Sequence, residues 1–180
     1  PVVSAAGTNY VLIMVHDGKN YIHTEPLASR SASDILAGYK RGHKFFHDHG
    51  AAVRYVRMDN EASTSLKDWI RQHEATVELV PPYVHRRNRA ERAIRTFKNH
   101  FISILCNTDP DFPLAAWDQL LPHAELTINL LRSSRQTPTV SAWVGMCGHF
   151  DFAAHPLGVP GTAIVAHEMP DSRESWAPHG

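Results

Sequence analysis

The sequence contains little cysteine and no long apolar run. Its two cysteines, Cys106 and Cys147, lie far apart, which excludes a disulfide framework and a thiolate zinc site of the usual spacing. This cysteine usage fits a reducing compartment. No apolar stretch is long enough to span a membrane, and the first residues, PVVSAAGTNY, do not form a secretory signal. These absences leave the charged and polar residues as the main source of information about function.

The net charge is zero, but the charges are unevenly distributed along the chain. The 18 Lys and Arg residues balance the 18 Asp and Glu residues, so the total charge indicates no partner. Residues 1–107 hold 15 Lys and Arg against 10 Asp and Glu, whereas residues 108–180 hold 3 against 8. Six cations surround Glu91 within residues 86–98. Such a patch favours phosphate binding, although the charge alone fits a solvated helix face equally well.

The length of 180 residues suits one domain with an appendage. Residues 1–135 are expected to form the main domain. Prolines and glycines interrupt the chain after that point, so residues 136–180 are expected to be a Pro/Gly-rich extension with one short strand at 162–167. The chain begins with Pro1 and not with Met. We therefore expect it to be a fragment or a processed product.

Apolar periodicity alternates between strand and helix along the main domain. The turn residues Asp17-Gly18-Lys19-Asn20 separate two β-branched runs and predict a β-hairpin, which Pro26 is expected to end. The expected elements are strands at 9–16 and 21–25, a helix capped by Ser31 or Ser33, a strand at 52–58, a short helix capped by Ser63, a strand at 76–80, a helix from about 88 to 105, and a helix at 113–132 split by Pro122. This order predicts an α/β fold with one mixed sheet flanked by helices.

The helix that starts near residue 88 combines an apolar stripe with a charged strip. Six apolar residues recur at helical spacing and are expected to be buried: Ala90, Ile94, Phe97, Phe101, Ile104 and Leu105. At about 100° per residue, Glu91, Arg95 and Lys98 share one polar strip beside that stripe. An ordinary interpretation remains open, because a Glu near a helix N-terminus complements the helix dipole and forms a weak pair with an Arg four residues later.

Two carboxylates occupy positions typical of a metal site. Asp59 follows a predicted strand and Glu91 lies in the first turn of the helix, with 31 residues between them. Ligands in open sheets gather beyond the carboxyl ends of strands, and paired carboxylates suit Mg²⁺. With a third carboxylate, two metal ions could flank a phosphodiester. Many α/β domains contain such a pair of acids, so the spacing alone does not decide the function.

Three segments together resemble a known family. They are VLIMVHDGKNYIHTEPL at 11–27, VRMDNEAS at 56–63 and VPPYVHRRNRAERAIRTFKNHF at 80–101. They are similar to the integrase catalytic core of copia-type LTR-retrotransposon polyproteins, which belongs to the RNase H-like superfamily of DDE polynucleotidyl transferases. The resemblance covers about residues 1–132. TPTVSAW and APHG in the remainder resemble the segment that follows this core in the same polyproteins.

The resemblance implies a fold, a reaction and a set of partners. It implies an RNase H-like fold that removes terminal nucleotides from the element's DNA and joins the freed 3′-hydroxyls to target DNA, with Mg²⁺ or Mn²⁺ as the cofactor. The implied partners are DNA and further copies of the chain, without a membrane or a small-molecule cofactor. The implied location is the nucleus at the point of action, after a cytoplasmic particle.

The same resemblance assigns roles to individual residues. Asp59 corresponds to the second acid of the triad and Glu91 to the third, so that both would be catalytic metal ligands. Arg95 and Lys98 correspond to basic positions that face the element's DNA end in retroviral relatives.

Three further residues belong to the segment before the catalytic helix. Tyr83 and Asn88 lie in the loop that precedes this helix in the family, and His85 in the same loop could touch phosphate. We therefore include all three among the expected DNA-binding residues.

The sequence departs from the family at several points. The family's first Asp lies in a strand that would precede Pro1, and Asp17 is a poor substitute because the match places it in the hairpin. The separation of Asp59 and Glu91 is shorter than in retroviral integrases, and the amino-terminal His/Cys zinc module is absent from this sequence. Two alternatives therefore stay open: a DNA-binding remnant of a retroelement without catalysis, and an RNase H-type nuclease.

Histidines offer a separate metal interpretation. His43 and His47 have the i, i+4 spacing of zinc-binding helices, and His49 follows, but the segment reads HKFFHDH without the HExxH glutamate. A solvated helix end, where cations complement the dipole, is the favoured interpretation of these three residues.

Overall fold

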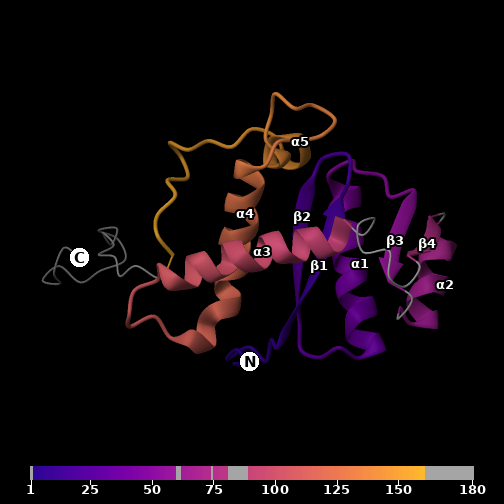
Figure 1. Ribbon diagram of the computed structural model, residues 1–180, viewed down its shortest axis with the longest axis horizontal. Coiled ribbons are helices and arrows are strands. Elements are labelled where there is room, and N and C mark those ends of the chain that lie inside the picture. Colours follow the sequence, from indigo (N-terminus) through magenta and orange to yellow (C-terminus); the bar gives the residue numbers. More distant parts are fainter. Residues whose placement is uncertain (1, 60–61, 74, 81–88, 161–180) are drawn as a thin grey trace, which may run out of the picture.

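The computed structural model describes residues 2–59, 62–73, 75–80 and 89–160. Tyr83, His85, Asn88 and the strand expected at 162–167 lie outside these residues. Figure 1 shows the long helix α3 crossing the β1–β2 hairpin, with β3, β4 and α2 grouped on one side of the molecule and α4 and α5 on the other. None of the described helices is both long and apolar enough to cross a bilayer.

The first two strands form the expected antiparallel hairpin. β1 (Tyr10–His16) pairs with β2 (Tyr21–Leu27), with His16 opposite Tyr21. In the turn, Asn20 has a φ of 55°, which Asn tolerates better than most residues. The strand continues through Pro26, contrary to the sequence prediction. Proline is tolerated there because β2 is an edge strand among the described residues.

Alternating side chains of β1 face two different apolar clusters. Val11, Ile13 and Val15 pack with α3 (Arg89–Cys106) and α4 (Leu121–Leu131), whereas Leu12 and Met14 pack with α1 (Ala32–Asp48). Successive side chains of a strand point to opposite faces. The hairpin is therefore covered by α3 and α4 on one face and by α1 on the other.

Helix α1 lies close against the hairpin because glycines face it. Ser31 caps the helix by accepting a hydrogen bond from the Asp34 backbone N–H at 3.1 Å. A Cβ atom added at Gly38 would come within 2.6 Å of Leu27 Cδ2, and one added at Gly42 would collide with Met14. The buried face of this helix consists of Gly38, Tyr39, Gly42 and Phe46.

The second pair of strands is parallel. β3 (Tyr55–Asp59) pairs with β4 (Thr76–Val80), and α2 (Thr64–Gln72), capped by Ser63, connects them. The sequence predicted one mixed sheet, but the described residues form two separate two-stranded sheets. Side chains of β1 and β3 share an apolar cluster around Tyr39 from α1. Packing on α1, and not backbone hydrogen bonding, connects the two sheets within the described residues.

The buried stripe of α3 differs in part from the prediction. Phe97 and Ile104 are buried as expected, but Ala93 replaces Ile94, which is 48% exposed. The buried stripe therefore includes the small Ala93, and the larger Ile94 lies at its edge.

The segment after α3 contains the predicted break and one unexpected helix. A 3₁₀ helix, η2 (Leu114–Leu120), leads into α4, and Pro122 lies in the first turn of α4, where its missing N–H is not needed. The short helix α5 (Ala142–Cys147) was not predicted. Ser141 caps this helix, and Gly148, which has a φ of 89°, ends it. A serine and a glycine at these two positions are the signals that the sequence offers for this helix.

Polar side chains of α4 protect the outer edge of β2. Asn129 accepts a hydrogen bond from the Ile22 backbone N–H at 2.9 Å and donates one to the Ile22 carbonyl at 2.7 Å. Glu125 accepts a hydrogen bond from the Thr24 backbone N–H at 2.8 Å. Asn129 and Glu125 take the place of a neighbouring strand and satisfy backbone groups that would otherwise be buried without partners.

Candidate active site and nucleic-acid interface

Each of the two predicted acids lies at one end of a strand or helix. Asp59 is the last residue of β3 and pairs in register with Val80, the last residue of β4. The chain leaves β4 at Val80 and next enters the described structure at Arg89, the first residue of α3. Glu91 lies in the first turn of α3 and is partly buried. Because the description does not extend to the Asp59 side chain, the pairing of the two carboxylates stays a prediction.

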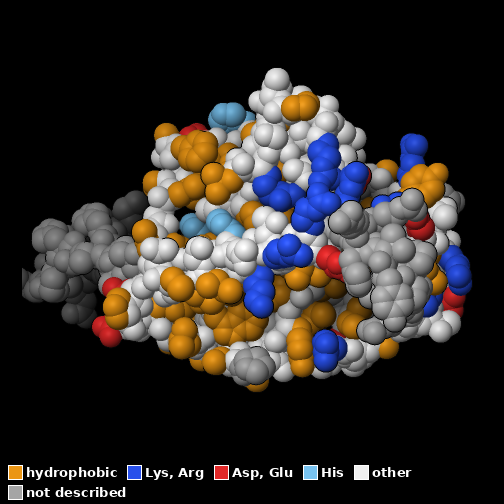
Figure 2. Space-filling model, viewed as in Figure 1, with side chains coloured by type: hydrophobic (Ala, Val, Ile, Leu, Met, Phe, Trp, Pro, Cys, Tyr) orange, Lys and Arg blue, Asp and Glu red, His pale blue; other side chains and the backbone are white. Residues whose placement is uncertain are grey.

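Four cations cross the exposed face of α3. Arg89, Arg92, Arg95 and Lys98 recur every three residues and all are exposed. At about 100° per residue, this spacing carries the positive charge diagonally across the helix, from one border of the buried stripe to the other. Figure 2 shows Lys and Arg side chains gathered over the first half of α3 and the adjoining tip of the hairpin. We call these four residues the α3 cation track.

Asp17 in the hairpin turn is engaged by two arginines. Its carboxylate forms ion pairs with Arg89 of α3 and with Arg135, which follows α4. Arg135 also donates a hydrogen bond to the Asp17 carbonyl at 3.0 Å. Guanidinium groups hold the Asp17 carboxylate, which is a physical reason why Asp17 is a poor substitute for a catalytic acid.

A buried polar cluster, not predicted from the sequence, surrounds His23. His23 Nδ1 lies 2.9 Å from Glu125 Oε1, and Nε2 lies 2.9 Å from Glu25 Oε1. Glu25 also accepts a hydrogen bond from Arg41 Nε at 2.6 Å, and the His23 ring stacks on Phe45 with centroids 4.3 Å apart. Burial alone would lower the pKa of His23, but the hydrogen bonds to Glu125 and Glu25 outweigh it and raise this pKa to about 9. His23 is therefore a buried imidazolium between two carboxylates.

The raised pKa of His23 means that the folded protein is expected to lose stability as the pH becomes alkaline. A group whose folded pKa lies above its unfolded value of 6.5 stabilises fully below pH 6.5 and loses this contribution as the pH rises through about 9. The difference corresponds to about 3 kcal/mol. We expect the free energy of unfolding to fall by an amount of this order between pH 6.5 and 9.5, measured by urea denaturation.

A matched variant isolates the contribution of His23. His23→Gln keeps a hydrogen-bonding side chain without a titrating ring, so its unfolding free energy should change much less over the same pH range. An equal pH dependence in both proteins would show that His23 does not titrate as described.

His43 of α1 and His49, which follows this helix, contact groups of the protein itself. His43 packs against Trp69 with centroids 5.1 Å apart, and His49 Nδ1 lies 2.7 Å from the Phe45 carbonyl oxygen. Among the side chains that the structure describes, no group of three or more His, Cys, Asp or Glu residues is arranged to hold a metal ion.

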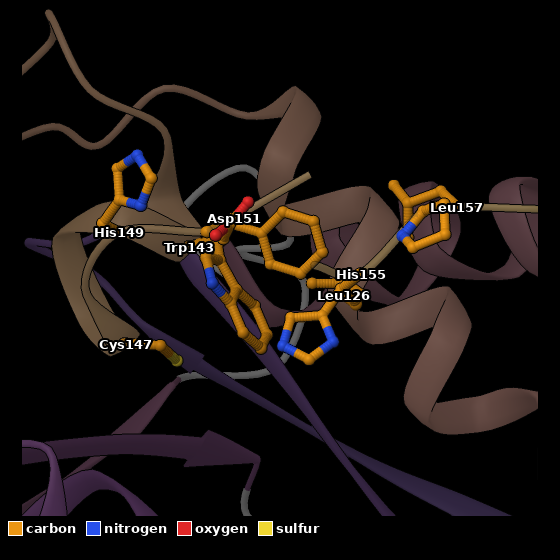
Figure 3. Close-up of a pocket in the computed structure, with 9 residues that line it drawn as sticks. Leu126, Trp143, Cys147, His149, Asp151, His155 and Leu157 are labelled. Carbon is orange, nitrogen blue, oxygen red and sulfur yellow. The ribbon is translucent and has the colours of Figure 1, made fainter. Parts of the chain in front are cut away.

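A cavity of about 490 Å³ lies between α4, α5 and the segment that follows α5. Figure 3 shows His149 at one end of this cavity and Leu157 at the other, with Trp143 and His155 between them. The Trp143 ring contacts the Phe150 ring edge to face, with the ring centroids 6.1 Å apart. The lining is largely aromatic and apolar and does not include Glu91 or the α3 cation track.

The fold places the chain in a recognisable structural class. An antiparallel hairpin, a parallel βαβ unit and a long helix with an acid in its first turn form the mixed α/β fold of integrase catalytic cores. The comparisons with solved structures establish this fold, whereas searches of protein-family models and of curated protein sequences find no match.

Two retroviral structures illustrate the similarity. One is the HTLV-2 integrase catalytic core domain, solved in complex with magnesium in a dimeric form, with 13% identity and a TM-score of 0.55 over 74% of this chain and 80% of that chain. The other is the catalytic core domain of BIV integrase, with 12% identity and a TM-score of 0.56 over 76% of this chain and 84% of that chain. The predicted fold class is confirmed.

Proposed function

We propose that this chain is the catalytic core of a metal-dependent polynucleotidyl transferase and, more narrowly, a copia-type retrotransposon integrase core that acts on DNA in the nucleus. The observation that carries the proposal is the integrase-core fold with Asp59 at the end of β3 and Glu91 in the first turn of α3. The adjacent α3 cation track supplies the positive surface that a DNA substrate requires.

The two acids suit a magnesium site. Carboxylate oxygens are the hard ligands that Mg²⁺ and Mn²⁺ prefer, and the HTLV-2 core was solved with magnesium. Asp59 and Glu91 would hold the metal together with the family's first Asp. When bound, the metal would activate the attacking oxygen and stabilise the leaving oxygen of the phosphodiester.

The remaining residues position the DNA. Arg95 and Lys98, exposed one and two turns after Glu91, would bind backbone phosphates next to the acids. Tyr83, His85 and Asn88 precede α3 in the sequence and would contact the DNA end. The dimeric form of the HTLV-2 structure supports a homo-oligomer for the proposed reaction.

The separation of the two sheets supports the position proposed for the first Asp. Among the described residues, β1 pairs only with β2 and β3 pairs only with β4. Within the part of the chain that the structure describes, each of β1 and β3 therefore has one edge without a strand partner, while their side chains meet in the cluster around Tyr39. We propose that a strand encoded upstream pairs between β1 and β3 and carries the first Asp to the site.

The decisive experiment extends the chain by about 30 upstream residues, the reach of one strand and its lead-in. The extended protein is incubated with Mg²⁺ and a duplex that ends in the element's terminal sequence. Terminal nucleotide removal followed by joining to a second duplex is expected. DNA binding without products would favour the remnant, and cleavage confined to RNA in an RNA–DNA hybrid would favour the nuclease; either result would overturn the integrase proposal.

Lys98→Ala is expected to weaken DNA binding and its salt dependence. Each phosphate contact contributes about 0.9 to the slope of log K against log salt for B-DNA, so the slope should become shallower by about that amount. Fluorescence anisotropy with a labelled duplex at several salt concentrations measures it. Lys44→Ala on α1, which lies on the opposite face of the hairpin and is also exposed, is the matched control. An unchanged slope for Lys98→Ala would contradict a DNA contact at this residue.

A further inference from the structure

Three distant segments meet at the tip of the β1–β2 hairpin. The turn at residues 17–20, the start of α3 and the residues after α4 converge there. We call Asp17, Arg89, Arg132 and Arg135 the hairpin-tip cluster. It contains three guanidinium groups and one carboxylate, so it has a net positive charge.

The cluster is held in a defined geometry by the backbone. The Arg135 and Gln136 N–H groups donate to the Gly18 carbonyl at 3.1 and 2.9 Å. Arg132 donates from Nε to the Asn20 carbonyl at 3.1 Å and from Nη2 to Asn20 Oδ1 at 2.6 Å. Burial, together with the charge of Arg135, lowers the pKa of Arg132. Like charges are thus held close together, and the Asp17 carboxylate lies between two of them, Arg89 and Arg135.

The exposed ion pairs of this cluster contribute little to fold stability. The side chains of Asp17, Arg89 and Arg135 are 62%, 49% and 41% exposed, and ion pairs at such positions contribute only about 0–1 kcal/mol. Asp17 engages Nη1 of each arginine, and a guanidinium carries five N–H donors in a planar fork. The forks match phosphate oxygens, which guanidinium groups bind in a bidentate manner.

The cluster is continuous with the α3 cation track. Arg89 belongs to both, because it opens α3 and pairs with the hairpin turn. Figure 2 shows that the blue side chains extend from α3 onto the tip of the hairpin without a break by a large apolar area. Positive charge therefore continues beyond the helix, where a nucleic-acid backbone lying on α3 would continue.

We propose that the hairpin-tip cluster is a second phosphate-binding site for the DNA backbone, and that Asp17 is its positioning residue. Asp17 contacts Nη1 of Arg89 and of Arg135, and the other guanidinium nitrogens would donate to a phosphate. This inference rests on the proposed function for its ligand, duplex DNA, and adds contacts from the hairpin and from the segment after α4 to those of α3.

The test measures affinity for a short labelled duplex without metal, as a function of salt. Arg135→Gln should make the slope of log K against log salt shallower by about 0.9. Asp17→Asn gives the sharper result. If Asp17 only repels phosphate, removing its charge should tighten binding; if it positions the arginines, binding should weaken by about two- to fivefold, which is the range of one exposed pair.

Matched controls lie on α2. Arg71 and Asp68 form an exposed pair there at 3.2 Å, so Arg71→Gln and Asp68→Asn make the same charge changes away from the cluster. Their DNA affinity should equal that of the unsubstituted protein. Equal melting temperatures for all four variants confirm that folding is unaffected.

The outcomes separate this inference from the proposed function. Tighter binding by Asp17→Asn, or an unchanged salt slope for Arg135→Gln while Lys98→Ala loses slope, would overturn the second site and leave the proposed function intact. Equal competition by polyglutamate and by DNA would overturn the nucleic-acid ligand. Absence of DNA binding by the unsubstituted protein would overturn both.

Discussion

Glu91→Gln in the upstream-extended protein is expected to reduce metal-dependent DNA cleavage and strand transfer by about a thousandfold or more. Glutamine has nearly the same shape but lacks the charge that holds a divalent cation. A metal ion supplies several kcal/mol of transition-state stabilisation, and each 1.36 kcal/mol corresponds to a factor of ten in rate. The assay compares initial rates of strand joining at saturating Mg²⁺.

Two measurements test whether the loss of activity comes from Glu91 itself. Glu78→Gln on β4 removes an exposed carboxylate paired with Arg57 at 2.8 Å and should leave the rate unchanged. DNA affinity of the Glu91→Gln protein should be equal or slightly higher, because a negative charge near phosphate is lost. Full activity in the Glu91→Gln protein would contradict both the integrase and the nuclease interpretations.

Glu125→Ala is expected to lower the free energy of unfolding by about 3–5 kcal/mol, the usual cost of removing one partner of a buried charge pair. The Glu125 carboxylate accepts hydrogen bonds from the Tyr21 hydroxyl at 2.9 Å, from the Thr24 N–H at 2.8 Å and from the Thr24 hydroxyl at 2.7 Å. It also pairs with His23. Alanine would remove the acceptor of the Tyr21 hydroxyl and of the two Thr24 donors, and one of the two carboxylates that His23 contacts.

The measurement is urea denaturation at pH 7, with the midpoint compared at constant m-value. Glu78→Ala is the control, since an exposed pair such as Arg57–Glu78 contributes about 0–1 kcal/mol. A loss for Glu125→Ala no larger than for Glu78→Ala would show that α4 does not stabilise the edge of β2 through this residue.

Local sequence signals predicted most elements because their causes are local. Ser31 and Ser63 cap α1 and α2 as expected, since a serine side chain accepts from an N–H only three residues away. The hairpin turn and the split at Pro122 follow from backbone preferences of single residues. The helix α5 was missed because six residues with a central glycine give too little periodicity.

The polar groups of the fold could not be predicted in the same way. Glu125 and Asn129 lie on α4 at helical spacing, where a sequence pattern favours a solvated face. Their burial depends on β2, about 100 residues earlier in the chain, which offers them unpaired backbone groups. Likewise, nothing near Asp17 in the sequence indicates that Arg89 and Arg135 would meet there.

The sequence by itself determined the α/β class, the order of the elements from β1 to α3, the positions of Asp59 and Glu91 at element ends, and the basic character of α3. These properties depend on side-chain periodicity and on caps within a few residues. Only the tertiary structure decided that His23 is a buried imidazolium, that α4 protects β2, and that the positive surface continues from α3 onto the hairpin tip. Each of these depends on segments far apart in the chain, because burial and charge proximity arise only when such segments pack together.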